Sequence, residues 1–337
     1  MTGRASVFSD DRVIDLLTNR FIPVADNCSY TQRQDDAKGE FFRLIAEQGH
    51  YAGRTKPTST RQGLYTATAD GELLASVNTN NVERVLKMID SALSKWQEEH
   101  VDGGRATVPV VYEADEQYDR VFPDGGMTLR QTIRDLPRAD DPKANTSPHN
   151  FDHVWLTQAE VQALIPAELT PGAEHTVPAE VVRRIAQFHL VDQVRGEAPA
   201  WRTDSIQDAA LSLRVEKVKG SQAHIKLTGH ARIEQPASDR VNPFSGVKFD
   251  MDRGVDVQFT GSLVYDSSVE TGGDSGAGAF TRFDVVATGS RWGATVYNFR
   301  SEDLGPAPIG FAFELLPPTP ANLTPPKFVL WDYFRDS

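Results

Sequence analysis

Leu211-Ser-Leu-Arg-Val215 is the first of five segments in which apolar and polar residues alternate along the C-terminal part of the chain. Alternation with a period of two places the apolar side chains on one face of a β-strand and the polar side chains on the other. Polar or glycine-rich loops join the segments, which predicts a mostly antiparallel sheet with one polar face. The other four segments are residues 224–228, 255–259, 280–286 and 309–315.

Three of the predicted strands carry a Thr-Gly pair followed by a polar residue, at Thr228-Gly229, Thr260-Gly261 and Thr288-Gly289. Glycine inside a strand is typical of a bulge or a bend that coils the sheet. We therefore expect a barrel-like sheet or a sheet that grips a helix.

A long helix precedes these strands. Pro178 stands at its predicted first position, its apolar residues lie mostly on one side, and Gly196 is its predicted end. The helix and the sheet would form a domain over residues 178–337 that closes with a proline-rich tail. Residues 101–177 are expected to be a connecting region with a hairpin and a short helix, which the capping box Thr157-Gln-Ala-Glu160 opens.

The first hundred residues have a different order of predicted elements. Helical spacing of apolar residues alternates there with short apolar runs and turn signals. The elements are a helix at 10–20 capped by Ser9, a strand at 21–25, a helix around 41–45, a hairpin turn at Asp70-Gly71, and a helix up to Trp96 that Asn80 and Glu83 cap.

Residues 7–97 resemble thioredoxin-like domains of the spermatogenesis-associated and DsbD-like kind. The stretch Val7-Phe-Ser-Asp-Asp-Arg-Val-Ile-Asp-Leu-Leu-Thr-Asn-Arg-Phe-Ile-Pro-Val24 is similar to the one that follows their active-site motif, and Thr66-Ala-Thr-Ala-Asp-Gly71 is similar to their third-strand hairpin. The resemblance implies an incomplete thioredoxin-like α/β module over residues 1–100. With the helix and antiparallel sheet that follow, the expected fold class is α+β.

The redox chemistry of that family needs a Cys-x-x-Cys pair at the start of the first helix, where the helix end activates the thiolate. Residues 1–6 contain no cysteine, residues 60–63 lack the proline that faces the pair, and Cys28 is the only cysteine in the chain. One thiol cannot cycle between a dithiol and a disulfide. We therefore expect a redox-silent interaction platform; the alternative is a gene start further upstream that restores the missing strand and the dithiol.

The length and net charge of the chain limit the number of domains and the kinds of partner that we expect. A chain of 337 residues exceeds the usual size of one core, so two domains are expected. A formal net charge of -12 disfavours nucleic acid and anionic membranes as partners. No apolar run approaches the length needed to span a bilayer, and the first residues lack the pattern of a signal peptide. The sequence as given predicts a cytoplasmic protein, or an exported one if a signal has been removed.

Histidines of the middle region are candidate metal ligands. The segment His149-Asn-Phe-Asp-His153 and the pair His189 and Asp192 together offer imidazoles and carboxylates. A transition metal such as zinc or iron could bind there if the loop folded against the predicted helix, and these residues would then support a metal-dependent enzyme. Surface histidines in a loop and a helix histidine bonded to backbone are the alternative interpretation, and in that case no cofactor is needed.

Arginine and tryptophan side chains are candidate ligand-binding residues. Guanidinium and aromatic groups together bind anionic or planar ligands, although they also cap the edges of cores. The candidates are Arg195, Trp201, Arg202, Arg291 and Trp292.

The apolar tail Phe328-Val-Leu-Trp-Asp-Tyr-Phe334 should pack either on its own domain or on a partner, which includes a second copy of the chain. The sequence therefore predicts a binding or interaction protein with a ligand- or partner-binding β-domain. The alternative is the metal-dependent enzyme that uses the histidines of the middle region.

Overall fold

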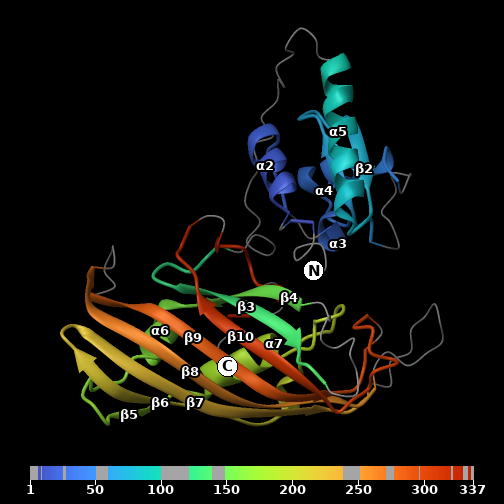
Figure 1. Cartoon of the computed structure of the whole chain (residues 1–337). Helices are drawn as coiled ribbons and strands as arrows, with labels where there is room; N and C mark the ends of the chain where they lie inside the picture. The colour runs from blue at the N-terminus through green and yellow to red at the C-terminus, as the bar shows by residue number, and fades with distance from the viewer. Residues whose placement is uncertain are drawn as a thin grey trace. The chain divides into compact units, whose positions relative to one another are not determined.

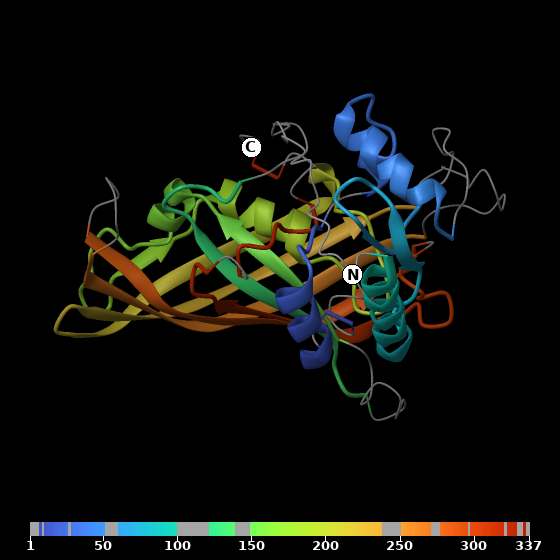
Figure 2. The same cartoon turned by 90° about the horizontal axis from the view of Figure 1, so that it is seen from above.

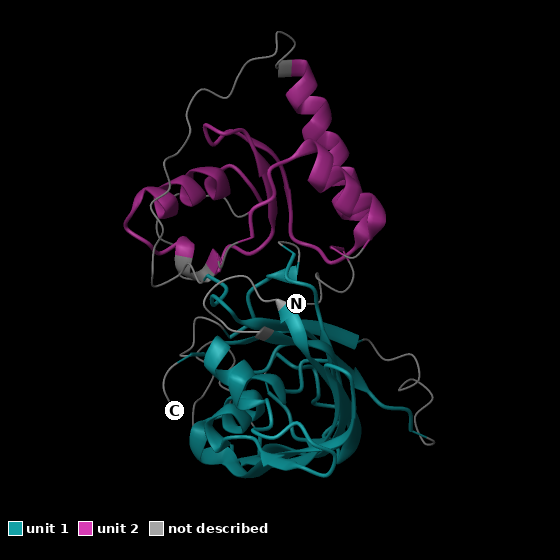
Figure 3. Cartoon of the chain, turned by 90° about the vertical axis from the view of Figure 1, so that its left-hand side faces the viewer, with its two compact units in different colours: residues 1, 115–337 teal, residues 2–114 magenta. Residues whose placement is uncertain are grey.

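A computed structural model describes residues 7–8, 10–25, 28–50, 60–99, 121–138, 149–237, 251–270, 277–295, 297–319, 322–328 and 333–334. The chain divides into two compact units, residues 2–114 and residues 115–337 with Met1 (Figure 3). None of the described helices is both long enough and apolar enough to cross a membrane.

The unit of residues 2–114 contains a two-stranded hairpin and helices (Figure 1). The strands pair antiparallel as predicted, and Gly71 adopts the positive φ of 90° that the turn requires. Val13 of the first helix and Val85 and Ile89 of the last share a small core with residues of the hairpin. The elements are α2 (Asp11–Arg20), α3 (Cys28–Thr31), α4 (Ala37–Glu47), β1 (Leu64–Ala67), β2 (Leu73–Val77) and α5 (Val82–Glu99).

Three local predictions for this unit are wrong. Residues 21–25 form no strand; the side chains of Ile22 and Val24 are 92% and 83% exposed, so this apolar run lacks the sheet neighbour that a strand needs. The N-cap of α2 is Asp10, whose side chain accepts a hydrogen bond from the Arg12 amide, rather than Ser9. Asn81, not Asn80, accepts a hydrogen bond from the Arg84 amide at the start of α5.

The unit of residues 115–337 is built on one eight-stranded antiparallel sheet, in the order β4-β3-β10-β9-β8-β7-β6-β5 (Figures 1 and 2). The five predicted strands are confirmed and correspond to the five strands from β6 to β10. The strands are β3 (Met127–Asp135), β4 (His149–Leu156), β5 (Glu174–Thr176), β6 (Ile206–Lys219), β7 (Gln222–Gln235), β8 (Arg253–Glu270), β9 (Ala277–Trp292) and β10 (Ala307–Leu315).

Residues 101–177 are more than the expected connecting region, because they supply β3, β4 and β5 of this sheet. β3 pairs with β10, which lies far along the chain, and a local sequence pattern carries no signal of such pairing. The capping box at Thr157 and Glu160 is confirmed at the start of α6 (Gln158–Ala163).

Helix α7 (Ala179–His189) packs against the sheet, and the space between them is filled by a single apolar core. The helix ends at His189, well before the predicted end at Gly196, and the chain continues through the buried residues Leu190 and Val191. Trp155 and Leu213 are among the fully buried side chains of this core. These side chains form the core of the described part of the unit.

The strand glycines do not mark bulges. Pairing is in regular register at Gly229, Gly261 and Gly289, whereas the register shifts lie elsewhere, as at Ile206/Asp208. A Cβ on Gly229 would lie 2.3 Å from the Ala210 carbonyl oxygen. These glycines therefore permit the close approach of neighbouring strands.

Candidate functional site

The four candidate metal ligands do not converge. His149 and His153 lie on β4, opposite Arg134 and Arg130 of β3. His189 is buried at the end of α7, and both carboxylate oxygens of Asp192 accept hydrogen bonds from the guanidinium of Arg300. Within the described ranges, no group of three or more His, Cys, Asp or Glu side chains could hold a metal ion.

Arg300 is the centre of a buried ion-pair network. Its side chain is 0% exposed. Its guanidinium donates to both oxygens of Asp135, at 2.6 and 2.9 Å, and to both oxygens of Asp192, at 2.8 and 2.9 Å. A fifth hydrogen bond, of 3.2 Å, reaches Asp303. All five N–H donors of this guanidinium are therefore used.

Three further arginines complete the network. Arg195 lies 2.9 Å from Asp135 and 3.1 Å from Asp303. Arg138 and Arg291 also donate to Asp303. Burial alone would raise the pKa of Asp135, but the hydrogen bonds and the charge of Arg300, with the charge of Arg195, hold that pKa below its ordinary value. Asp135 is therefore ionised, and the network is a clamp of ion pairs inside the fold, which we call the charged clamp.

The clamp holds the loop between β9 and β10, residues 293–306. Arg300 is one anchor of this loop. A second is the backbone amide of Glu197, which donates a hydrogen bond of 2.8 Å to the Tyr297 carbonyl. Gly196 lies so close that an added Cβ would be 2.0 Å from that same carbonyl oxygen. The loop is therefore tied both to the sheet and to the chain that follows α7.

Two aromatic side chains of this fixed loop are largely exposed, and the ring of Phe299 lies beside Gly196. Tyr297 is 58% exposed and Phe299 is 69% exposed, although Arg300 directly follows them and is fully buried. Phe299 has a φ of 53°, a left-handed conformation that costs a bulky residue about 1–3 kcal/mol and persists only where the surrounding contacts impose it. The bonds of Arg300 supply such contacts, so the aromatic rings are presented by a preorganised loop.

A shallow recess lies at the base of the loop, with a volume of about 460 Å³. Trp292 lines it, and its ring rests on Gly254, where an added Cβ would lie 2.1 Å from the indole. The other lining residues are mostly apolar, with Asp252 as the charged exception. They are Met251, Gly293, Leu304, Gly305 and Pro306.

The five candidate ligand-binding residues therefore have different roles. Trp292 lines an open recess, whereas Arg195 and Arg291 belong to the buried clamp. The indole N–H of Trp201 donates to the Leu190 carbonyl at 2.8 Å in the core. Arg202 is exposed and pairs with Asp204 at 3.0 Å. The five residues do not form one concave binding face, because most of them are already satisfied by protein partners.

The described part of the C-terminal tail packs on its own unit. Phe328 and Tyr333 are buried in the main core. The Tyr333 hydroxyl accepts a hydrogen bond from the Trp155 amide at 3.2 Å and lies 2.6 Å from His189 Nε2. Burial raises the pKa of Tyr333 to about 12. The sequence left open whether the tail packs on its own domain or on a partner, and these residues pack on their own unit.

The Cys28 thiol is in no disulfide and lies on the short helix α3, not at the start of α2. No protein-family model matches the chain, and no significant match appears among curated proteins or solved structures.

Sequence reasoning did not find the exposed aromatics Tyr297 and Phe299 or the acidic partners Asp135 and Asp303. A usable signal was present for the loop: Phe299 and Tyr297 break a polar, glycine-bounded segment between two strands. Asp135 gave no signal, because it lies 165 residues from Arg300 in the sequence.

Proposed function

We propose that this chain is a binding protein without thiol-disulfide chemistry, and that the loop of residues 293–306 is its contact surface. The proposal rests on one observation: Tyr297 and Phe299 are exposed on a loop that Arg300 fixes from inside the fold. Aromatic side chains dominate the energetics of protein interfaces. A preorganised loop adds affinity because little conformational entropy is lost on binding.

We propose a peptide segment of a partner protein, apolar with basic residues, as the ligand. The exposed charges beside the aromatics are acidic, namely Glu302 on the loop and Asp252 at the recess. Arg291 and Arg300 add no free positive charge, because both are paired with aspartates. The net charge of -12 also favours the approach of a basic partner.

The N-terminal unit is proposed to be a thioredoxin-like platform that is silent in redox chemistry. Support for this comes from the resemblance of residues 7–97 and from the single cysteine of the chain. Cys28 has no second thiol with which to form an intrachain disulfide. Turnover of insulin disulfides by the purified protein would contradict this part of the proposal.

A peptide-display selection on the immobilised full chain tests the binding site. Peptides enriched on the wild-type protein should bind the double variant Tyr297→Ser/Phe299→Ser at least about tenfold more weakly, as expected for the loss of two interface anchors. Val218→Ser is the control, since Val218 is an exposed apolar residue on β6. Equal binding to the wild type and the double variant would contradict the site, and enrichment of acidic peptides would contradict the proposed ligand class.

A further inference from the structure

A second recess, lined mostly by polar side chains, lies at the edge of the sheet where β5 pairs with β6. Its volume is about 660 Å³. β5 is the last strand of the sheet, and β6 pairs with β7 on its other side. Leu213 and Val215 of β6 are fully buried in the core, so the residues that alternate with them face the recess. The recess therefore lies on the face of the sheet that points away from the core.

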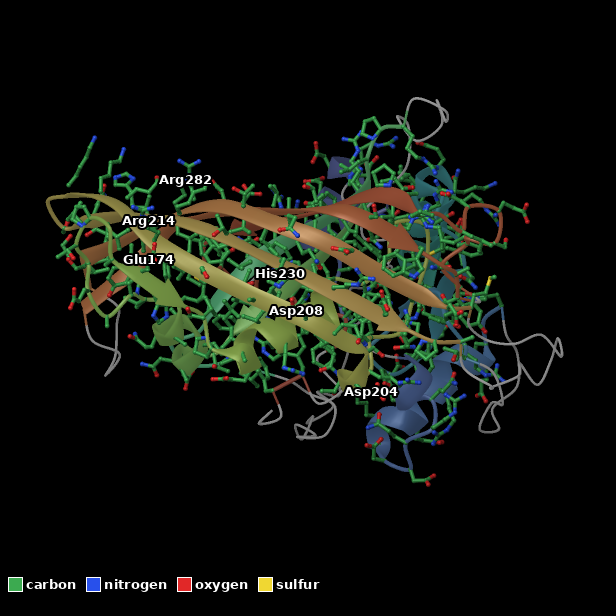
Figure 4. The ribbon with its side chains drawn as sticks, turned by 90° about the horizontal axis from the view of Figure 1, so that it is seen from below. Glu174, Asp204, Asp208, Arg214, His230 and Arg282 are labelled. Carbon is green, nitrogen blue, oxygen red and sulfur yellow. The ribbon has the colours of Figure 1, made fainter. Side chains whose placement is uncertain are left out.

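The floor of the recess is a grid of six polar side chains in two rows. Strand pairing places one residue from each of the three strands in each row, with neighbouring strands about 4.8 Å apart. Figure 4 shows Glu174 and Arg214 beside each other on β5 and β6. One row carries charges and the other carries hydroxyl groups. The charged row is Glu174, Arg214 and Lys226, and the hydroxyl row is Thr176, Ser212 and Thr228.

The rim of the recess is anchored on two sides. The Val215 amide of β6 donates a hydrogen bond of 2.9 Å to the Ala173 carbonyl, directly before β5. His175, the residue after Glu174 in β5, has its Nε2 2.7 Å from the Ala163 carbonyl oxygen at the end of α6. The strand that carries Glu174 is therefore held in place without a ligand, which favours binding because little order has to be gained.

Four charged side chains line the recess, and their charges sum to zero. Glu174 and Glu216 supply two negative charges, and Arg214 and Lys226 supply two positive charges. Among the side chains that the structure describes, none of these four takes part in an ion pair. All four groups are therefore available to a ligand.

Other opposite charges on the same face of the sheet do pair. Arg282 lies 2.5 Å from Asp284, and Arg130 lies 2.5 Å from Glu314. An exposed ion pair adds little to stability, so the fold loses little by leaving the groups of the recess unpaired.

The mixture of charges selects a ligand that carries both signs. A ligand with only negative charge would meet Glu174 and Glu216, and one with only positive charge would meet Arg214 and Lys226. A carboxylate beside an ammonium group meets opposite charges on neighbouring strands, and a guanidinium can bind both oxygens of a carboxylate. We propose that this recess binds a free α-amino acid, with its carboxylate on Arg214 and Lys226 and its ammonium group on Glu174.

The lining also limits the kind of ammonium group and of amino acid. Quaternary ammonium groups are bound by aromatic rings, and no Phe, Tyr or Trp is among the described residues that line this recess. A primary ammonium group instead donates hydrogen bonds to carboxylate oxygens. The hydroxyl groups of Thr176, Ser212 and Thr228 offer donors and acceptors to a polar side chain. We therefore expect polar amino acids to bind more tightly than apolar ones.

Calorimetric titration of the full chain with each free L-amino acid tests the site. At least one polar amino acid should bind. Its N-acetyl form lacks the ammonium group and its amide form lacks the carboxylate, so each should bind at least about tenfold more weakly. Inorganic phosphate is the probe for a site that accepts any anion.

Two variants assign each charge of the ligand to a residue. Arg214→Gln and Glu174→Gln should each weaken binding of the amino acid at least about tenfold. Arg214→Gln should also shrink the difference between the amino acid and its amide form, because the carboxylate has lost a partner. Glu174→Gln should shrink the difference between the amino acid and its N-acetyl form. Lys219→Gln is the control on the same strand, outside the recess, and should leave binding unchanged.

The proposal is overturned if no free amino acid binds, or if Arg214→Gln or Glu174→Gln binds it as tightly as the wild type. It is also overturned if phosphate or the N-acetyl form binds as tightly as the amino acid. Both substituted residues are exposed and the changes add no bulk, so loss of folding is not the expected cause; circular dichroism verifies this. Residues 293–306 do not line the recess, so the outcome is independent of the proposed binding function.

Discussion

At the scale of single residues, Arg300 combines complete burial with complete hydrogen bonding. Removing one member of a buried ion pair leaves its partner charged in a medium that solvates it poorly. Arg300 has two such partners, Asp135 and Asp192, each held by two hydrogen bonds. Its loss should therefore cost much more than the loss of an exposed arginine.

We expect Arg300→Met to lower the free energy of unfolding by about 3–5 kcal/mol, because the buried carboxylates of Asp135 and Asp192 each lose two hydrogen bonds from a guanidinium. Urea unfolding followed by tryptophan fluorescence measures this change. Arg202→Met is the matched control: the Arg202 side chain is half exposed and, within the described part of the chain, forms an ion pair only with exposed Asp204, so its loss should change stability by less than about 0.5 kcal/mol. Equal effects of the two changes would show that the clamp does not stabilise the fold.

His189 is a second residue whose environment predicts a measurable effect. Burial, and the nearby charge of Arg184, lower the pKa of His189 well below 6.5. Its Nδ1 has no hydrogen-bond partner among the residues that the structure describes, and its Nε2 lies 2.6 Å from the Tyr333 hydroxyl. The neutral tautomer with the proton on Nε2 fits this arrangement, because it leaves no buried N–H without an acceptor.

The lowered pKa of His189 has a defined sign for stability. Below pH 6.5 the unfolded chain binds a proton at His189 that the folded chain does not, so stability falls as pH falls. Between pH 7.5 and 5.5 the wild type should lose about 1 kcal/mol more than His189→Gln, which keeps an N–H donor but does not titrate. Urea unfolding at the two pH values measures the difference. Parallel losses in the two proteins would rule out a buried neutral histidine.

At the scale of elements, the close approach of β8 and β9 depends on glycine. An added Cβ on Gly289 would lie 2.0 Å from the Asp256 carbonyl oxygen and 2.8 Å from Val257 Cα, and backbone atoms cannot move aside as a flexible side chain can. We expect Gly289→Ala to destabilise the unit by about 1–3 kcal/mol, as overpacking does elsewhere. Thermal unfolding of this variant against Thr288→Ala, at the exposed neighbouring position, measures it. A midpoint equal to that of Thr288→Ala would show that the strands adjust without cost.

The sequence predicted those strands whose inward side chains are apolar. The strands from β6 to β10 alternate clearly, whereas β4 places Asn150 and Asp152 inside the fold. Asn150 donates to the Gln193 carbonyl at 2.7 Å, and Asp152 accepts a hydrogen bond from the Lys327 amide at 3.0 Å. Such partners make a buried polar residue tolerable, but they lie far along the chain and leave no local pattern. This is why the pattern of the sequence did not predict β4 as a strand.

Fewer residues of the candidate site than of the sheet could be predicted, again because their partners leave no pattern in the local sequence. Trp292, a candidate ligand-binding residue at the end of a strand, lines a recess, and its role in binding stays a prediction. Arg291, the residue before it, points into the fold, since successive residues of a strand face opposite sides. The sequence alone could not show that its partner Asp303 comes from the following loop.

At the scale of the whole molecule, the two units have separate cores. The core around Val13 and Ile89 shares no residue with the core around Trp155 and Leu213, and the division falls between residues 114 and 115. A unit that buries its own core and satisfies its own charges should fold alone. For residues 115–337 the clamp of Arg300 and the packing of Tyr333 both lie within the unit.

We therefore expect a fragment of residues 115–337 to unfold in urea at the same midpoint as the corresponding transition of the full chain. Tryptophan fluorescence reports this transition selectively, because four of the five tryptophans lie in the fragment and only Trp96 lies outside it. Far-UV circular dichroism of the full chain should add a second transition from the helices of residues 2–114. A fragment midpoint lower than that of the full chain would mean that the units stabilise each other. A single coincident transition of the full chain would point to the same conclusion, because independent cores have no reason to unfold together.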